Sequence, residues 1–486
     1  MTKELRRLSI VMLAMFLSLF IATSWIQVVA ADTLAQNGNN KRTQLDSYEI
    51  QRGSIIVDGT AIATSVAAED RYQYQRVYQD AAMWAPVTGY FNPALQSATG
   101  IEQAMNADLS GTGSNAFFGE IERILSGQPQ QGLSVQLTLD AAAQKAAWDA
   151  LQGYQGAVVA IEPATGRVLA MASTPGFDTN ELASHDATAV NAAHDRLSDD
   201  PTNPLYNRAI AGNLNPPGST FKIVVAAAAL ASGEWNMDSE LPNPARYTLP
   251  GTSTSISNAS GTTCGGGETT TIAQALELSC NIPMAELAVE LGDERIRETA
   301  EKFGFNDSEL NIPLAVTESV YPSSLNEPET ALTGFGQGQV TSTPLQMAMV
   351  AAGIANDGVV MTPRMVDAVI GDDFAVHREF EDTVYQQVLD ANDAAAITQA
   401  LVTGVDSGAA TGARIDGVDV AGKTGTAQNG DSRPYTLWFT GSAPADNPQV
   451  AVAVVVEDGG GKGQSGSGNG IAAPIAKKVI EAVLGR

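Results

Sequence analysis

The 486-residue sequence predicts an α+β protein. We expect an antiparallel sheet with flanking helices, preceded by a small α+β domain and an N-terminal transmembrane helix. Three observations predict this class: a long apolar run near the N-terminus, several strand-like segments in the later part of the chain, and apolar helical segments between them. A length of this size allows two or three domains. We therefore divide the chain into residues 1–31, 32–140 and 141–486.

The N-terminal segment has the composition of a membrane anchor. Lys3, Arg6 and Arg7 precede residues 8–31, which contain no charged side chain. Roughly 22 to 24 apolar residues can span a bilayer, and the positive flank stays inside. A secretory signal has a shorter apolar region of about 7–15 residues, although residues 29–31 could serve as a cleavage site. We expect an uncleaved single-pass anchor in the cell membrane, with the rest of the chain extracytoplasmic.

Residues 32–140 are predicted to hold a polar linker and a small mixed domain. The linker covers residues 32–42, residues 48–57 alternate like a strand, and residues 115–125 are expected to be helical. Residues 133–139 are apolar at alternate positions and end at Asp140. We expect this aspartate to cap a helix over residues 141–151.

The remaining chain is predicted to form one main sheet. Residues 156–161 and 168–173 should form a hairpin, and residues 418–423, 435–442 and 449–457 should be later strands of the same sheet. The glycine-rich residues 459–470 are expected to be a flexible surface turn, followed by a terminal helix over residues 473–484.

Charge and histidine content exclude some functions. The formal net charge of −27 argues against nucleic-acid binding by simple electrostatics. The three histidines, His185, His194 and His377, form no metal-ligand pattern, and we expect no cofactor.

The first motif with catalytic meaning is Ser219-Thr220-Phe221-Lys222. Positions i and i+3 lie one helical turn apart, so the Lys222 amine can reach the Ser219 oxygen. A lysine removed from water, with a second cation nearby, has a lowered pKa and can act as a base. Residues 223–231 are nearly all apolar and predict a buried helix. By itself the motif also fits a helix N-cap serine with a solvated lysine.

Two further motifs follow in order. Ser279-Cys280-Asn281 comes after a helical stretch at 272–278, and Lys423-Thr424-Gly425-Thr426 comes after an apolar-alternating segment at 415–421. Motifs of the types S-x-x-K, S-x-N and K-T-G together are typical of penicillin-binding proteins and class A β-lactamases.

A competing nucleotide-binding interpretation fails. Residues 417–424 fit the phosphate-loop pattern G-x-x-x-x-G-K-[ST], which requires a strand before the first glycine and a helix after the lysine. Here the strand-like residues lie inside the supposed loop, and residues 425–434 contain two glycines and a proline.

Nearly the whole chain resembles a class B penicillin-binding protein, a monofunctional DD-transpeptidase of the actinobacterial A type. The resemblance includes these segments: Gly156-Ala157-Val158-Val159-Ala160-Ile161, Ser173-Thr174-Pro175-Gly176-Phe177-Asp178, Asn207-Arg208-Ala209, Pro216-Pro217-Gly218-Ser219, Gly336-Gln337-Gly338, Thr343-Pro344-Leu345-Gln346-Met347-Ala348 and Trp438-Phe439-Thr440-Gly441. The family's pedestal motif is only partly present, because residues 52–59 lack its Asp-Arg-Asn part. The resemblance implies a β-lactamase-like transpeptidase domain at 141–486 and a pedestal, or dimerisation-like, domain at 32–140.

The resemblance also implies a mechanism. Ser219 is expected to attack the penultimate D-alanine of a stem peptide, while Lys222 takes its proton. Ser279 is expected to relay a proton to the departing D-alanine, and Asn281 to hold the peptide and Lys222. Lys423 is expected to lower the pKa of Lys222 and to attract the substrate carboxylate.

The third motif is expected to bind substrate through Thr424, Gly425 and Thr426. By resemblance, the oxyanion hole consists of the backbone N–H groups of Ser219 and Thr426. The implied partners are peptidoglycan stem peptides, β-lactam antibiotics and a membrane glycosyltransferase of the shape, elongation and division type. Two alternatives remain: a hydrolase, either a D-alanyl-D-alanine carboxypeptidase or a β-lactamase, and a penicillin sensor or scaffold without turnover.

The chain has two cysteines, Cys264 and Cys280. In an exported protein such a pair can form a disulfide, and the glycines at 265–267 would let the loop bend back. The alternative is that Cys280 only fills the middle position of the second motif and Cys264 is a loop thiol.

Overall fold

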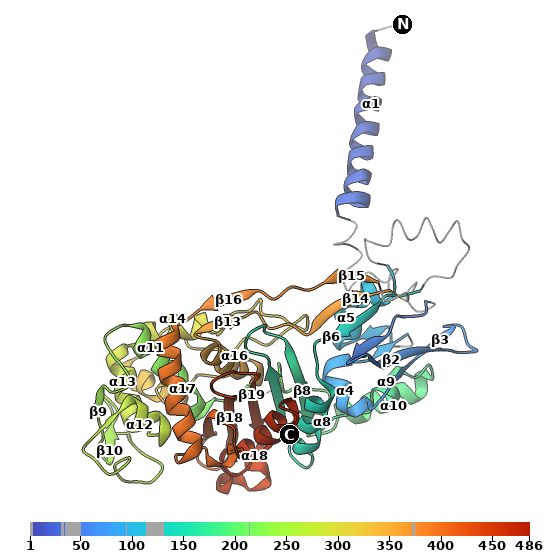
Figure 1. Cartoon of the computed structure of the whole chain (residues 1–486). Helices are drawn as coiled ribbons and strands as arrows, with labels where there is room; N and C mark the ends of the chain where they lie inside the picture. Colours follow the sequence, from blue (N-terminus) through green and yellow to red (C-terminus); the bar gives the residue numbers. More distant parts are fainter. Residues whose placement is uncertain are drawn as a thin grey trace.

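The computed structural model describes residues 3–30, 34, 50–93, 95–112, 131–212, 214–371 and 375–486. Figure 1 shows a long N-terminal helix and a body of mixed helices and strands. Apart from Leu34, the predicted linker at 32–42 lies outside the described residues, as does the predicted helix at 115–125.

The N-terminal helix is long and apolar enough to cross a membrane. Helix α1 (Lys3–Ser24) continues into a π-helical turn η1 (Trp25–Val29), and neither contains a buried residue. Together they form a candidate span of 27 residues with a mean hydropathy of 2.1 in its most apolar window.

The first sheet has six strands in the order β15-β14-β6-β1-β2-β3, and we call it the pedestal sheet. Strand β1 pairs parallel with β6, whereas the other neighbours are antiparallel. Its strands are β1 (Ile55–Val57), β2 (Thr60–Ala67), β3 (Tyr74–Tyr78), β6 (Ser134–Leu137), β14 (Val366–Ile370) and β15 (Val376–Glu379).

Two features of the pedestal sheet differ from expectation. The strand predicted at 48–57 is limited to Ile55–Val57 among the described residues 50–57, and positions 48 and 49 lie outside the described residues. Strands β14 and β15 come from the segment assigned to the last domain, yet β14 pairs with β6. The buried side chains of Val366 and Val369 attach this distant segment to the pedestal core.

The start of the pedestal is held by a buried ion cluster. Arg52 and Arg76 both pair with Glu102, with N–O distances of 2.7 and 2.5 Å. A Cβ on Gly53 would lie 2.0 Å from the Leu133 carbonyl oxygen, so only glycine fits beside β6. Glu102 lies in α5 (Gly100–Ala104). The short elements linked to α5 or to the pedestal sheet through successive contacts are α4 (Ala81–Thr88), β4 (Phe91–Asn92), β5 (Ser97–Ala98), α6 (Asn106–Leu109), α9 (Thr179–Ala183) and α10 (Ala187–Ser198).

The second sheet is antiparallel and five-stranded, in the order β17-β18-β19-β7-β8. Its strands are β7 (Gly156–Ile161), β8 (Val168–Thr174), β17 (Ala421–Ala427), β18 (Thr436–Ala443) and β19 (Val450–Val456). The predicted hairpin is confirmed. The strand predicted at 418–423 is displaced: it begins at Ala421 and runs through the third motif to Ala427.

Both faces of this sheet are covered, which explains its continuous apolar strands. Val159 and Ala453 belong to the core beneath α16 (Pro344–Ala355), whereas Val158 and Val454 face α8 (Ala141–Leu151) and α18 (Ala472–Val483). The predicted cap of α8 is confirmed, since the Asp140 carboxylate accepts from the Ala143 N–H at 2.7 Å. The predicted α+β class with a preceding pedestal is therefore confirmed.

Most other helices form a group beside the free edge of β17 (Figure 1). They are α11 (Lys222–Ala231), α12 (Ile272–Glu277), α13 (Ile282–Leu291), α14 (Asp293–Lys302), α15 (Glu327–Thr333) and α17 (Ala391–Asp406). Short strand pairs join them: β9 (Glu240–Pro242) with β12 (Thr269–Thr271), β10 (Arg246–Thr248) with β11 (Ser255–Ser257), and β13 (Val359–Met361) with β16 (Val384–Gln387).

Candidate active site

The first motif forms a tight turn that enters a buried helix. Ser219 lies in the 3-10 turn η2 (Gly218–Phe221), is half-buried, and precedes Lys222, the first residue of α11. Every residue from Lys222 to Leu230 is buried. The predicted buried helix is confirmed, and the alternative of a solvated lysine is wrong because Lys222 is 0% exposed.

The second motif sits at the junction of two helices. Helix α12 ends before Ser279, whose φ of +60° is in the left-handed region, and α13 begins directly after Asn281. The left-handed residue turns the chain sharply between the helices. Non-glycine residues adopt this conformation uncommonly, and it costs of order 1–3 kcal/mol when the surroundings enforce it.

Lys222 points at this junction. Its Nζ donates to the Ser279 carbonyl oxygen at 2.8 Å and to Asn281 Oδ1 at 2.9 Å, and it lies 3.4 Å from Ser279 Oγ. The structure therefore brings the first two motifs into direct contact, with Asn281 holding the lysine.

Lys423 reaches the same hydroxyl from the sheet. Its Nζ donates to Ser279 Oγ at 2.7 Å and to the Thr424 carbonyl oxygen at 3.2 Å, and its side chain is 2% exposed. Ser279 Oγ thus lies between two buried amines, and all three motifs meet at one atom.

Burial lowers the pKa values of both amines, and the charge of Lys423 lowers that of Lys222 further. Burial, followed by the charge of Lys423, places the pKa of Lys222 well below its usual range. Burial lowers the pKa of Lys423 to about 7. A lysine amine that is easily neutral can accept a proton, which is the property that a base for a serine hydroxyl requires.

In the rest of the third motif, Thr424 and Gly425 are buried and only Thr426 is exposed. The Thr424 hydroxyl donates to the Ala409 carbonyl oxygen at 3.0 Å, and Thr426 is exposed. A Cβ on Gly218 would be 3.3 Å from the Ala427 side chain, so the turn carrying Ser219 packs directly against this strand.

The glycine-rich loop packs against the third motif through Gly468, a contact that the sequence did not reveal. The Gly468 N–H donates to Thr426 Oγ1 at 3.2 Å, and a Cβ there would lie 2.4 Å from the carbonyl oxygens of Gly425 and Trp438. The loop also includes the 3-10 turns η4 (Asp458–Gly461) and η5 (Gly463–Ser465). The prediction of a flexible surface turn at residues 459–470 did not include this packing. A run of glycines looks the same in the sequence whether the loop is flexible or packed against a strand.

The two cysteines form a disulfide beside the second motif. The Cys264 and Cys280 sulfur atoms are 2.02 Å apart. Asn243 fixes the loop end through hydrogen bonds in both directions with the Cys264 backbone, at 2.7 and 3.0 Å. Asn258 Oδ1 accepts from the Asn281 N–H at 2.9 Å. The turn that carries Ser279 and Asn281 is therefore tied to the adjacent loops.

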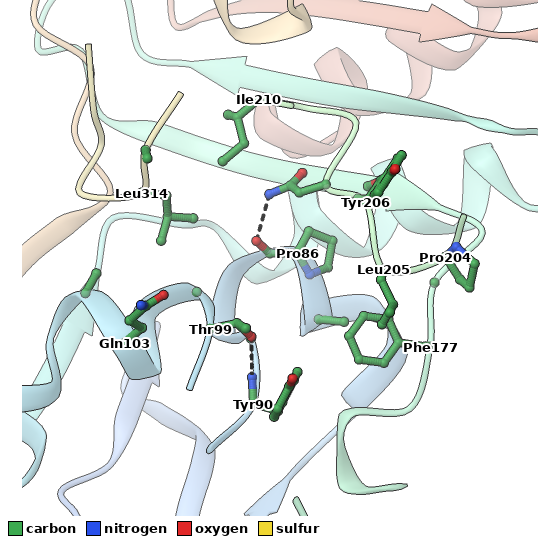
Figure 2. A pocket seen from close by; sticks show the side chains of 18 of the residues that line it. Pro86, Tyr90, Thr99, Gln103, Phe177, Pro204, Leu205, Tyr206, Ile210 and Leu314 are labelled. Atoms are coloured by element: carbon green, nitrogen blue, oxygen red, sulfur yellow. Dashed lines mark hydrogen bonds between the residues drawn. The ribbon is translucent and has the colours of Figure 1, made fainter. Parts of the chain in front are cut away.

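The structure excludes one competing interpretation of the third motif. β17 continues as a strand past Lys423, where a phosphate loop would need a helix, so the phosphate-loop interpretation is wrong. Within the described part of the chain, no group of three His, Cys, Asp or Glu side chains could hold a metal ion. A cavity of about 550 Å³ lies between α4, α5 and the segments 204–207 and 313–315 (Figure 2), and none of the three motifs lines it.

Both parts of the chain match known protein families. The penicillin binding protein transpeptidase domain matches residues 156–481, and the penicillin binding protein A dimerisation domain matches residues 52–135. The peptidoglycan D,D-transpeptidase PbpA of Mycolicibacterium smegmatis is 38% identical over 491 residues, covering 100% of this chain and 99% of that protein. The corresponding protein of Mycobacterium tuberculosis H37Rv is 37% identical over 495 residues, with the same coverage.

Solved structures agree with these relatives. The crystal structure of PBPA from M. tuberculosis superposes with a TM-score of 0.85 at 37% identity, covering 90% of this chain and 100% of that chain. The penicillin G acyl-enzyme complex of the same protein gives a TM-score of 0.84 at 36% identity, with the same coverage.

Proposed function

Because the chain belongs to the penicillin-binding protein transpeptidase family, we propose that it is a membrane-anchored peptidoglycan D,D-transpeptidase. It cross-links stem peptides through a serine acyl-enzyme, releases D-alanine, and is acylated by β-lactams. The observation that supports this best is the position of Ser279 Oγ between the amines of Lys222 and Lys423, with Ser219 one turn before Lys222.

In the first half-reaction, neutral Lys222 takes the hydroxyl proton of Ser219 as the serine oxygen attacks the carbonyl carbon of the penultimate D-alanine. The backbone N–H groups of Ser219 and Thr426 stabilise the negative oxygen of the tetrahedral intermediate. When the C–N bond breaks, the Ser279 hydroxyl gives its proton to the leaving D-alanine nitrogen and regains one from Lys222. The products are an ester on Ser219 and free D-alanine.

In the second half-reaction, an amine of another stem peptide attacks this ester. Its proton returns along the same path, through Ser279 and Lys222, to the departing Ser219 oxygen. A new amide bond joins the two stems and the enzyme is regenerated. Water attacking in place of the amine would give the carboxypeptidase or β-lactamase reaction, so the acceptor decides between these activities.

The third motif binds the terminal carboxylate of the donor stem. Lys423 supplies positive charge beside it. Gly425 lets the turn that carries Ser219 approach β17, because a Cβ at this position would lie 2.8 Å from the Pro217 carbonyl oxygen. Thr424 can redirect its hydroxyl proton from the Ala409 carbonyl oxygen to the carboxylate, and the exposed Thr426 adds a second hydroxyl. β-Lactams carry a carboxylate in the equivalent position and enter the same site.

The location and the polymerase partner are also part of the proposal. The candidate span α1–η1, which has the basic residues Lys3, Arg6 and Arg7 at its N-terminal end, supports a single-pass anchor with the catalytic domain outside. A membrane glycosyltransferase of the shape, elongation and division type would supply the glycan strands that this enzyme cross-links.

The function is tested by replacing the nucleophile. Ser219→Ala should keep the fold and lose all covalent labelling by penicillin, whereas the exposed Ser324→Ala should label like the wild type. Incubating the wild type with paired stem peptides should give a cross-linked dimer and D-alanine. Stoichiometric labelling of Ser219→Ala would contradict the assigned nucleophile, and rapid hydrolysis of the label would favour a hydrolase.

A further inference from the structure

We propose that Glu457, which lies outside the three motifs, is a positioning residue for acylation. Its carboxylate fixes the described residues 202–212 and 214–218 of the segment that precedes Ser219. The proposal rests on the assignment of Ser219 as nucleophile in the proposed function.

Glu457 lies directly after β19, and its side chain is 13% exposed. Its Oε2 accepts from Gln155 Nε2 at 2.6 Å and from Arg208 Nε at 3.2 Å, and its Oε1 accepts from Asn215 Nδ2 at 3.5 Å. One carboxylate therefore joins the main sheet to two points of the segment that precedes the nucleophile.

Arg208 organises the first part of this segment. Its guanidinium donates to the carbonyl oxygens of Thr202 and Asn203, and its backbone N–H donates to Ser173 Oγ at 3.0 Å. Its side chain is 3% exposed, and Glu457 is its only ion-pair partner among the described residues. Figure 2 shows Tyr206 and Ile210 of this segment at the cavity wall. The amide of Asn207 donates to the carbonyl oxygen of Pro86 in α4 at 2.9 Å.

Asn215 organises the end of the segment, four residues before Ser219. Its Oδ1 accepts from Thr436 Oγ1 at the start of β18 at 3.1 Å, and its carbonyl oxygen accepts from the Ser342 N–H at 3.0 Å. The next residues are Pro216 and Pro217, whose rings fix φ near −65° and limit rotation. A shift of Asn215 would therefore also shift Ser219, because the two prolines between them restrict rotation of the backbone.

The expected consequence is specific to the chemical step. Without the carboxylate, Arg208 is a buried charge without its partner, and Asn215 loses one of its anchors. The segment can then shift, and a displacement near 1 Å of a reacting group can cost about 10²-fold in rate. Glu457 contacts neither Lys423 nor Thr424 in the described structure, so noncovalent binding of a β-lactam carboxylate should be preserved.

The test measures acylation of the full-length protein in detergent across a range of penicillin concentrations, which separates the acylation rate constant from the Kd of the noncovalent complex. Glu457→Ala should lower the rate constant at least about tenfold and leave Kd within about threefold. Glu457→Gln, which keeps acceptor oxygen but not charge, should recover part of the rate. Asn215→Ala should lower the rate in the same way, and combining it with Glu457→Ala should cost less than the product of the two single effects.

A control variant weakens a more exposed ion pair elsewhere in the molecule. Asp382→Asn breaks the pair with Arg364, whose N–O distance is 2.7 Å, next to the pedestal sheet. It should not change the acylation rate constant. A folded Glu457→Ala variant that acylates at the wild-type rate would overturn the proposal. The proposal would also be overturned if Asp382→Asn had the same Tm as Glu457→Ala and lost as much of the acylation rate constant. If Glu457→Ala does not fold, the acylation rate constants and Kd values of Glu457→Gln and Asn215→Ala test the proposal in its place. Labelling of Ser219→Ala would instead overturn the nucleophile itself.

Discussion

At the scale of single residues, the site depends on Ser279 adopting a left-handed backbone. Its φ of +60° turns the chain so that its carbonyl oxygen and hydroxyl both face Lys222. Lys423 approaches the same hydroxyl at 2.7 Å. The hydroxyl can accept from one amine while donating to a neutral one, which makes it a suitable proton relay. The strain at Ser279 is offset by these contacts and by the neighbouring disulfide.

The role of Lys423 can be tested by Lys423→Met, which keeps the stem length and removes the charge. Acylation should fall at least about tenfold, since losing one charge-assisted contact costs roughly 1.5–3 kcal/mol. The loss should be larger for substrates that carry the carboxylate than for amide analogues that lack it. The Tm should not fall, because burial already disfavours the charged amine. Equal loss for both kinds of substrate would show that Lys423 does not bind the carboxylate.

Glu286 on α13 predicts a pH-dependent change in stability. Burial, then the charge of Glu290, raises its pKa to about 7. An acid with a raised folded-state pKa binds more protons in the folded protein between pH 4.5 and 7, so its contribution to the free energy of unfolding decreases as pH rises through this window. Glu286→Gln should therefore have a higher Tm than the wild type at pH 8 and a similar Tm at pH 4.5. A difference that is the same at both pH values would contradict this assignment.

At the scale of elements, the geometry of β17 depends on its neighbours. This strand is at the edge of the main sheet, pairs only with β18 within it, and carries the third motif. The turn carrying Ser219 packs against it at Gly218, and the glycine-rich loop contacts it at Gly468. The loop therefore supports the strand that is proposed to hold the substrate carboxylate and one oxyanion donor.

Replacing Gly468 tests this support. A methyl group in Gly468→Ala would overlap two backbone carbonyl oxygens, at 2.4 Å each, and must displace either the loop or β17. We expect acylation by penicillin to fall at least about tenfold, in line with the sensitivity of rates to displacements near 1 Å. Gly470→Ala is the control, because the nearest atom to its Cβ would be the movable Ser467 hydroxyl. Equal acylation rates for the two variants would show that the loop does not support catalysis.

At the scale of the whole molecule, the pedestal and the catalytic part share strands. Strands β14 and β15 come from the catalytic part of the chain and extend the pedestal sheet. The domain boundary at residue 140 stays a prediction. Dividing the chain at this residue would separate β6 from β14, its partner in the pedestal sheet. The candidate span α1–η1 precedes both parts.

The anchor is tested by extraction of the full-length protein from membranes. Detergent should be required, because the span has no charged residue from position 8 to 31. A version of the protein that begins at Asp32 should be soluble and should still be acylated by penicillin. Mature protein found in the medium with Asp32 at its N-terminus would show a cleaved signal instead.

The sequence by itself determined the features that depend on neighbouring residues. The cap at Asp140, the buried helix after Lys222, the hairpin at 156–174 and the order of the three motifs were all predictable, because hydrophobic periodicity and capping are local properties. The apolar character of β7 and β19 was also visible, although not that α16 covers one face and α8 and α18 the other.

Tertiary structure decided the rest. The sequence gives no sign that β14 joins the pedestal sheet, that Gly468 touches Gly425, or that Glu457 holds Asn215. These contacts join residues tens to hundreds of positions apart, and a single side chain placed by a distant backbone leaves no repeating pattern in the sequence. The convergence of Lys222 and Lys423 on Ser279 Oγ is of this kind, since the two lysines are 201 positions apart in the sequence. Only the packing of α11, the α12–α13 junction and β17 brings the two amines together and lowers their pKa values by burial.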